Sequence, residues 1–196
     1  MRIIGITGGV GAGKSTVLAY LEEMYGACVI QADQVGHRVM EPGERCYGQV
    51  LELFGENIKK SDKTIDRKRV SDVVFSRPDL LEKLNKIIHP AVKEAILEQI
   101  EAQRAAGCAL CIVEAALLLE EKYQDFCDEV WYIHADEEVR TSRLMRDRGY
   151  TRQKARDIMD SQASEDFFYA HADRVIENNR DLEETYRQIR EGIEQR

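Results

Sequence analysis

The sequence predicts an α/β fold in which a five-stranded parallel sheet carries helices on both faces. Three observations lead to this prediction. Short β-branched runs alternate with amphipathic stretches along the 196 residues. A glycine-rich phosphate-binding pattern directly follows the first run. No repeat, low-complexity tract or flexible linker interrupts the alternation, so one compact domain is expected.

The amino-terminal part of the chain predicts a strand, a helix and a second strand. Residues 2–7 form an isoleucine-rich run of strand length. The stretch 16–25 has apolar residues at helical spacing and stops at Gly26, a residue suited to a helix end. The apolar run 27–31 then predicts the second strand.

A second helix and a third strand are predicted in the middle of the chain. Pro90 suits the first turn of a helix, because its missing N–H group has no partner there in any case. Gly107 marks the end of that helix. The apolar run 109–113 follows as the third strand.

The carboxyl-terminal part completes the predicted sheet. The runs 130–133 and 174–176 predict the fourth and fifth strands. Asp181 then stands three residues before Glu184 in a capping-box pattern, which predicts the start of the last helix.

Two stretches depart from this alternation. Residues 39–89 are too many for one crossover helix, so we expect a helical insertion that binds a second ligand. The stretch 140–156 has six arginines and Lys154 against one acid, Asp147, a local charge of 7 − 1 = +6. This concentration predicts an anion-binding lid. The predicted subregions are a core of 1–38, 90–138 and 166–196, the insertion 39–89 and the lid 139–165.

The bulk composition excludes several classes of protein. The net charge is −8 and the isoelectric point about 5.2, which argues against a nucleic-acid partner because non-specific binding needs a basic face. The longest apolar stretch, 108–119, is interrupted by Glu114, so neither a membrane span nor a secretory signal is expected. We therefore expect a cytoplasmic protein without a membrane partner, either a monomer or a small homo-oligomer.

The five cysteines are an odd count. Cys28 and Cys111 lie in apolar runs that predict buried strands, which favours reduced thiols over a disulfide framework. Cys108 and Cys111 have the spacing of a redox or zinc half-site, but no second pair accompanies them at ligand spacing. Reduced cysteines are therefore expected.

The strongest signal is the pattern G-x-x-x-x-G-K-[ST], which runs from Gly8 to Ser15 and predicts a P-loop nucleoside-triphosphatase fold. Glycines let backbone N–H groups converge on phosphate oxygens, and the start of the following helix adds partial positive charge. Lys14 should reach the β- and γ-phosphates of ATP, and the Ser15 hydroxyl should bind Mg²⁺. The expected ATP-binding residues here are Gly9, Val10, Gly11, Ala12, Gly13, Lys14, Ser15 and Thr16.

Further positions are candidates for phosphoryl transfer. Asp33 follows the second strand, where its carboxylate could accept the proton of an alcohol or hold a metal-bound water, or could cap the next helix. Arg143 and Arg146 could face one phosphate from one side of a helix, or form a solvated basic face. His89 could contact a substrate phosphate, or could cap or pack a helix.

Pieces of a larger pattern occur along nearly the whole chain. They are Ile4–Val17 with its doubled glycine, Ala32-Asp33, Ile65-Asp66-Arg67, Val74-Phe75, Leu84-Asn85, His89-Pro90, Arg143-Leu144-Met145, Arg146-Asp147, Gln162, Ala172–Ile176 and Asn178. Together these pieces resemble the dephospho-coenzyme A kinase family.

The resemblance implies ATP-dependent phosphorylation of the ribose 3′-hydroxyl of dephospho-coenzyme A, the last step of coenzyme A biosynthesis. It also implies a nucleotide-kinase-like core, a helical coenzyme A domain, a mobile lid, and the use of ATP and Mg²⁺. By the same resemblance Asp33 is the base, Arg143 reaches the ATP phosphates, and the segment around Asn178 lines the adenine site. The expected catalytic residues are Asp33, Lys14 and Arg143, and the expected substrate-binding residues are Thr7, Asp33, His89 and Glu120.

The chain departs from the family pattern at three places. The family has an aspartate at the position of Gln31, so a second carboxylate near the metal is missing. A Pro-Leu-Leu-Phe-Glu pattern appears as Ala-Leu-Leu-Leu-Glu at 116–120, which keeps the acid and alters the turn before it. The family's arginine four residues before Gln162 is Ile158 here. Arg156 is the candidate to replace it, although two residues turn a helical side chain by about 200°.

Two other functions remain open from the sequence. A different kinase of the same fold, acting on a nucleoside, nucleotide or small alcohol, would share the ATP loop. A regulatory GTPase would use Asp33–Gly36 as its D-x-x-G motif and Asn85-Lys86 as half of a guanine-binding motif. However, no aspartate follows at Ile88, and four-residue patterns arise by chance.

Overall fold

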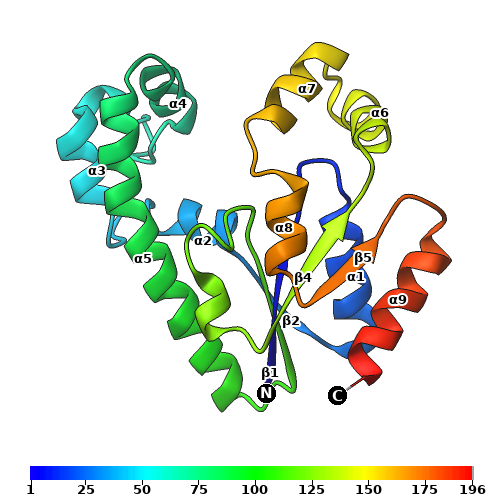
Figure 1. Ribbon diagram of the computed structural model, residues 1–196. Helices are drawn as coiled ribbons and strands as arrows, with labels where there is room; N and C mark the ends of the chain where they lie inside the picture. The colour runs from blue at the N-terminus through cyan, green and yellow to red at the C-terminus, as the bar shows by residue number, and fades with distance from the viewer. Residues whose placement is uncertain (196) are drawn as a thin grey trace. The chain divides into compact units, whose positions relative to one another are not determined.

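The computed structural model describes residues 1–195 (Figure 1). The chain forms two compact units. The first comprises Met1–Val29 and the chain from Gln103 onward, and the second comprises Ile30–Ala102. Within the described residues, no helix is long and apolar enough to cross a membrane.

Five strands form one sheet in the order β2-β3-β1-β4-β5. The pairings of β1 with β3 and β4, and of β4 with β5, are parallel. Every predicted strand is confirmed, and β3, β4 and β5 each end one residue later than predicted. In β3 the added residue is Glu114, which continues the pairing with β1. The strand bounds are β1 Arg2–Thr7, β2 Cys28–Gln31, β3 Leu110–Glu114, β4 Glu129–His134 and β5 Arg174–Glu177.

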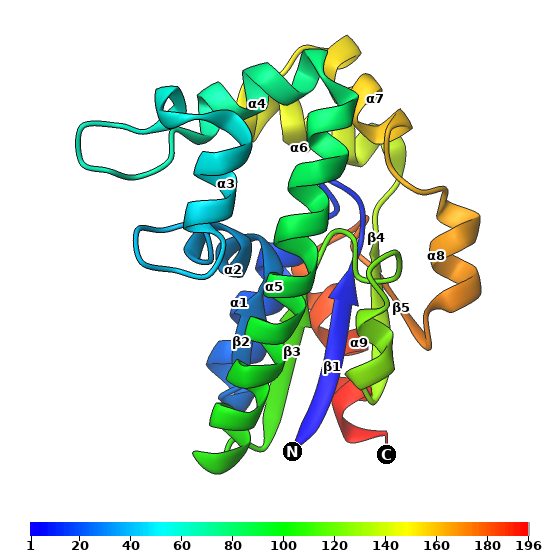
Figure 2. The same cartoon turned by 90° about the vertical axis from the view of Figure 1, so that its left-hand side faces the viewer.

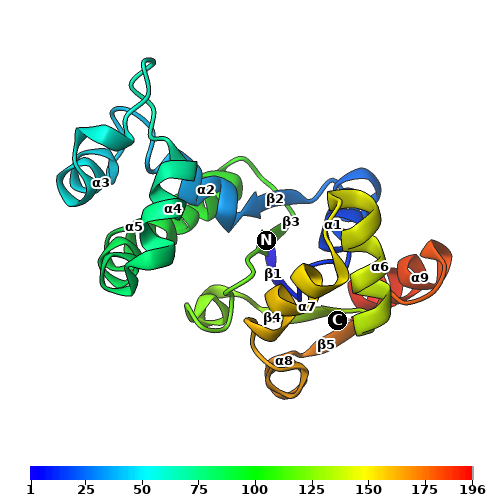
Figure 3. The ribbon, with the colours of Figure 1, turned by 90° about the horizontal axis from the view of Figure 1, so that it is seen from above.

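Helices of the first unit cover both faces of this sheet, as predicted (Figure 3). On one face, Ile4 and Ile6 of β1 join a buried core with residues of α1 and α9. On the other face, Leu118 packs against Gly5, and Phe168 of α8 stacks on Tyr132 with ring centroids 4.9 Å apart. The helices of this unit are α1 Lys14–Tyr25, η2 Tyr123–Phe126, α6 Glu137–Arg148, α7 Arg152–Asp160, α8 Glu165–His171 and α9 Leu182–Glu194.

The second unit is helical, as expected for the insertion. Asp66 caps α4 by accepting hydrogen bonds from the backbone N–H groups of Lys68 and Arg69. The elements that begin in this unit are α2 Ala32–Arg38, α3 Tyr47–Phe54, η1 Glu56–Ile58, α4 Arg67–Ser76 and α5 Pro78–Ala105.

The long helix α5 corrects one predicted boundary (Figure 2). We expected a helix to begin at Pro90, but α5 begins at Pro78 and Pro90 lies inside it. A proline at either position satisfies the helical φ angle. Pro90 removes one internal hydrogen bond and crowds the carbonyl group of Lys86, but the apolar stripe of α5 continues past it. The predicted limit of the insertion at residue 89 therefore falls in the middle of a helix.

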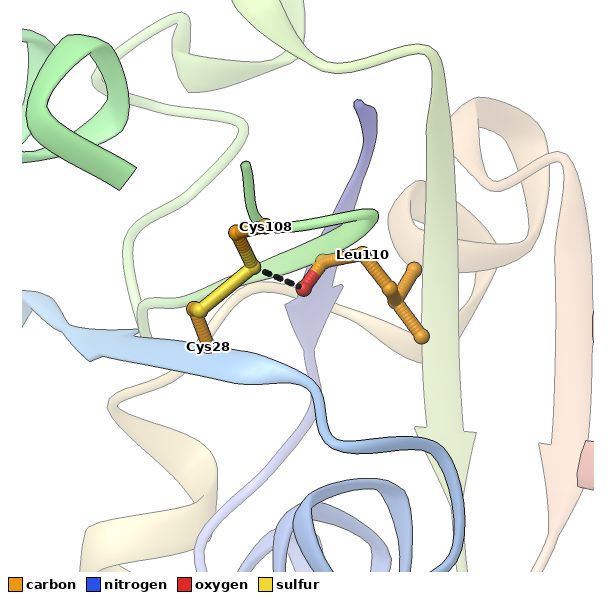
Figure 4. Close-up of a disulfide and its surroundings, with 3 residues drawn as sticks. All are labelled: Cys28, Cys108 and Leu110. Atoms are coloured by element: carbon orange, nitrogen blue, oxygen red, sulfur yellow. Dashed lines mark hydrogen bonds between the residues drawn. A yellow bond between two sulfur atoms is a disulfide. The ribbon is translucent and has the colours of Figure 1, made fainter. Parts of the chain in front are cut away.

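The cysteines correct a second expectation (Figure 4). Instead of five reduced thiols, Cys28 and Cys108 form a disulfide with their Cα atoms 6.8 Å apart. Cys28 begins β2 and Cys108 precedes β3 by two residues, and these strands are neighbours in the sheet. The strand order thus brings together two residues separated by 80 positions. The free cysteines are Cys46, Cys111 and Cys127.

Candidate active site

The glycine-rich loop connects β1 to α1. Gly13 is the N-cap residue of α1, with a left-handed φ of 91°, and within the described chain no side chain caps this helix. The first N–H groups of α1 are therefore available to an anion. Lys14 folds back across the loop, and its Nζ donates a hydrogen bond to the carbonyl oxygen of Gly8 at 2.8 Å. The geometry is that of a phosphate cradle.

Lys14 also forms an ion pair with Glu114, for which we predicted no role from the sequence. Its Nζ lies 3.6 Å from Oε1 of Glu114, and both side chains are largely buried. Glu114 ends β3, the strand next to β1. An acid directly after an apolar run, at the carboxyl end of a strand, was the sequence signal for this position. We predicted no site role for Glu114, because we interpreted it only as an acid that interrupts the longest apolar stretch.

Asn178 and Arg143 both support the back of the loop. The Asn178 side chain is 1% exposed and donates from Nδ2 to the carbonyl oxygen of Ala12 at 2.7 Å. Arg143 donates to the same oxygen at 3.2 Å and to the Asn178 carbonyl oxygen at 2.8 Å. Burial, together with the nearby charge of Arg146, lowers the pKa of Arg143. Both predicted residues, Arg143 and Asn178, thus contact the loop by donating hydrogen bonds to a backbone carbonyl group.

The hydroxyls beside the loop suit a bound nucleotide and its metal. Thr7 ends β1, is fully buried, and its Oγ1 has no hydrogen-bond partner among residues 1–195. Buried polar atoms are nearly always hydrogen-bonded, so the Thr7 hydroxyl beside the loop is one of the exceptions that require an explanation. Ser15 is the second residue of α1 and is exposed, which leaves its hydroxyl accessible to Mg²⁺.

The three other predicted acceptor-site residues, Asp33, His89 and Glu120, lie on different elements of the chain. Asp33 is in the first turn of α2, whose N-cap is Gln31, and no side-chain cap bond forms there within the described chain. The capping role considered for Asp33 is therefore absent. His89 lies inside α5, so it does not cap a helix either. Glu120 is exposed in the turn that follows β3.

Most lid arginines are paired with acids. Arg152 contacts Glu138 at 2.8 Å, and Arg156 lies 3.6 Å from Glu137. These two glutamates immediately precede the stretch whose charge was counted as +6, so the count overstated the local charge. Arg156 is thus paired with Glu137, and its replacement of the arginine missing at Ile158 stays a prediction. Gln162 instead accepts a hydrogen bond from Arg140, a residue that the sequence argument did not single out.

Comparisons with known proteins show the family to which the chain belongs. The family described as dephospho-CoA kinase matches residues 2–184. A dephospho-CoA kinase of Shouchella clausii is 34% identical over 97% of this chain and 96% of its own, and one of Dehalococcoides mccartyi is 38% identical over 91% and 89%. A crystal structure from Thermus thermophilus superposes with a TM-score of 0.83 at 29% identity, covering 98% of this chain and 96% of its own. The chain belongs to the dephospho-CoA kinase family, the ATP-dependent kinases of the last step of coenzyme A biosynthesis.

Proposed function

We infer that this kinase transfers the γ-phosphoryl group of ATP to the ribose 3′-hydroxyl of dephospho-coenzyme A and releases ADP and coenzyme A. The observation that carries this proposal is the loop with Lys14 folded across it, in a chain whose relatives bear the name dephospho-CoA kinase. We further propose that the reaction takes place in the cytoplasm, with a small-molecule acceptor and no nucleic-acid or membrane partner, in a monomer or small homo-oligomer.

The first unit supplies the groups that bind ATP. Lys14 and the N–H groups at the start of α1 bind the phosphates, and the Ser15 hydroxyl binds Mg²⁺. When bound, the metal neutralises charge on the phosphate oxygens. Arg143 now touches the outside of the loop, and we propose that it contributes positive charge to the phosphates. The segment at Asn178 lines the adenine site.

The acceptor requires groups that orient a hydroxyl and take its proton. We propose Asp33 as the base, because its carboxylate is exposed and is not used as a helix cap. An ionised aspartate can orient the alcohol and accept its proton as the phosphoryl group is transferred. Thr7, His89 and Glu120 are the proposed acceptor contacts.

A turnover experiment tests the acceptor separately from ATP use. The protein is incubated with ATP and Mg²⁺ together with dephospho-coenzyme A, adenosine or AMP, and the products are separated by chromatography. We expect ADP and a phosphorylated product with dephospho-coenzyme A and only background ADP with the other two. Equal turnover of adenosine or AMP would indicate a different small-molecule kinase. No turnover by a folded sample with any acceptor would contradict the proposed activity.

A further inference from the structure

Arg140 and Gln162 together bind both backbone polar groups of one residue of the glycine-rich loop, Val10. Arg140 donates from Nε to the carbonyl oxygen of Val10 at 2.9 Å. The N–H group of Val10 donates to Oε1 of Gln162 at 3.0 Å. Nη2 of Arg140 donates to the same Oε1 at 3.0 Å. The three hydrogen bonds form a closed network that uses both the donor and the acceptor of Val10.

This network is packed tightly against the loop. Arg140 is 7% exposed, and a Cβ atom added to Gly9 would lie 2.3 Å from its Nη2. The guanidinium therefore rests directly on the backbone of Gly9, where only glycine leaves room for it. Arg140 lies in α6 and Gln162 follows α7, so the network links the loop to both ends of the predicted lid.

Arg140 also places a weakly neutralised positive charge beside the loop. Its ion pair with Glu165 is long, at 4.0 Å between Nη1 and Oε1, and the Glu165 side chain is about half exposed. Burial lowers the pKa of Arg140, which shows that the protein environment disfavours its charge. A polyanion bound in the loop would offset this unfavourable burial.

We propose that Arg140 and Gln162 are positioning residues for ATP: they fix the peptide groups on both sides of Val10 so that the loop keeps its phosphate-binding shape, and Arg140 favours the bound triphosphate electrostatically. The proposal rests on ATP binding by the loop, as inferred above. Arg140 contacts Gln162 in the structure, and the sequence predicts no partner for Gln162. Arg143 and Asn178 support the second half of the loop at Ala12, whereas the new pair supports its first half.

Two substitutions at one position separate this role from a merely structural one. Gln162→Met keeps the length of the side chain but removes the acceptor for Val10 and Arg140, whereas Gln162→Glu keeps an acceptor at the same atom. Gln153→Met is the matched control, because Gln153 lies on α7, is exposed, and donates to Asp157.

The readouts are the ATP dissociation constant in the absence of acceptor, and the steady-state constants. For Gln162→Met we expect the ATP Kd and the KM for ATP to rise about tenfold, because the two partly buried hydrogen bonds to Gln162 Oε1 are lost. We expect kcat and the KM for dephospho-coenzyme A to stay within about twofold. Gln162→Glu should restore ATP binding to within about threefold of the wild type, and Gln153→Met should match the wild type.

Several outcomes would overturn the proposal. These are an unchanged ATP Kd in Gln162→Met, the same loss in Gln162→Glu, or an equal rise in both KM values. If Gln162→Met does not fold, Arg140→Lys takes its place. Lysine keeps the positive charge but cannot donate to Val10 and Gln162 from two separate nitrogen atoms. The same selective loss of ATP binding is expected. Hydrogen exchange on the wild type gives an independent check, since the Val10 amide should be protected and free exchange would contradict the network. Wild-type protein that binds no ATP would defeat the proposed function itself.

Discussion

At the scale of single residues, the contact between Lys14 and Glu114 fixes the direction of the Lys14 side chain in the loop. The lysine spans the loop to Gly8 and the glutamate approaches the same ammonium group from β3. Both side chains are largely buried, so neither can easily find a replacement partner in water. Lys14 is therefore held pointing across the cradle, where phosphate oxygens are expected.

Replacing Glu114 by Gln should weaken the use of ATP. The amide removes the negative charge beside Lys14, so we expect kcat/KM for ATP to fall about tenfold, in line with the cost of breaking a partly buried pair. Steady-state kinetics measure this, and Glu183→Gln on the exposed surface of α9 is the matched control. An unchanged kcat/KM would show that Lys14 does not depend on this carboxylate.

Replacing Asp33 by Asn should affect the chemical step. The amide can still accept a hydrogen bond but cannot take the acceptor's proton, so kcat should fall about 100-fold or more while the ATP Kd changes little. Asp72→Asn, an exposed position on α4, is the control. A variant with normal kcat would remove Asp33 from the chemistry.

The sequence could predict Lys14 and Ser15 because the motif fixes their chemistry locally. The position of Glu114 at the end of an apolar run was a weak signal, but neither Glu114 nor Arg140 could be assigned to the loop as its partner. Their roles depend on which strand lies next to β1 and on which side of α6 faces the loop. These are properties of the folded chain, and no short motif encodes them.

At the scale of elements, the loop depends on the segments packed behind it. A Cβ atom on Gly13 would lie 2.2 Å from Nδ2 of Asn178, and the φ angle of Gly13 is +91°. Asn178 cannot move away easily, because its Oδ1 accepts from Thr185 in the buried core. The glycine is thus required by both its backbone angle and its neighbour.

Gly13→Ala should therefore disturb the whole loop. We expect a loss of roughly 2 kcal/mol or more in the free energy of unfolding, together with a loss of ATP binding. Thermal unfolding and ATP titration measure both effects. Gly48→Ala on α3 is the control, because a Cβ there meets no heavy atom within 4 Å and alanine favours a helix. Equal behaviour of the two variants would contradict the packing argument.

The strands were predictable as elements, since each is a short apolar run bounded by polar residues or glycine. Helix α5 was not, because Pro90 has the same local chemistry as a helix start. Its continuation through Pro90 depends on the packing of Val92, Ile96 and Ile100 along one stripe. Tertiary burial outweighs one lost hydrogen bond.

At the scale of the whole molecule, the disulfide encloses the second unit. Cys28 immediately precedes that unit and Cys108 follows it, so the bond closes a covalent ring that contains all of Ile30–Ala102. Cross-linking across 80 residues lowers the entropy of the unfolded chain. In the chain-entropy model this raises the free energy of unfolding by about 4–5 kcal/mol. The sequence did not predict this pairing, because it depends on β2 and β3 being neighbours.

Reduction should therefore lower the unfolding temperature of the protein. Thermal unfolding with and without a phosphine reductant measures this, with a Cys28→Ser, Cys108→Ser variant as the control that should no longer respond. At pH 8 reduction should also expose two reactive thiols. Burial raises the pKa of Cys111 to about 11 and that of Cys127 to about 12, so these two form little thiolate. An unchanged unfolding temperature and thiol count would contradict the bond.

The proposed activity is specific for one hydroxyl of dephospho-coenzyme A, the ribose 3′-hydroxyl. The most direct test is to isolate the product of a reaction with ATP and Mg²⁺ and to locate the new phosphate by ³¹P and ¹H NMR. We expect a phosphomonoester whose phosphorus couples to the ribose H3′ proton, formed in equal amount with ADP. A phosphate at the 2′ position, or ADP formed without a phosphorylated acceptor, would contradict the claim.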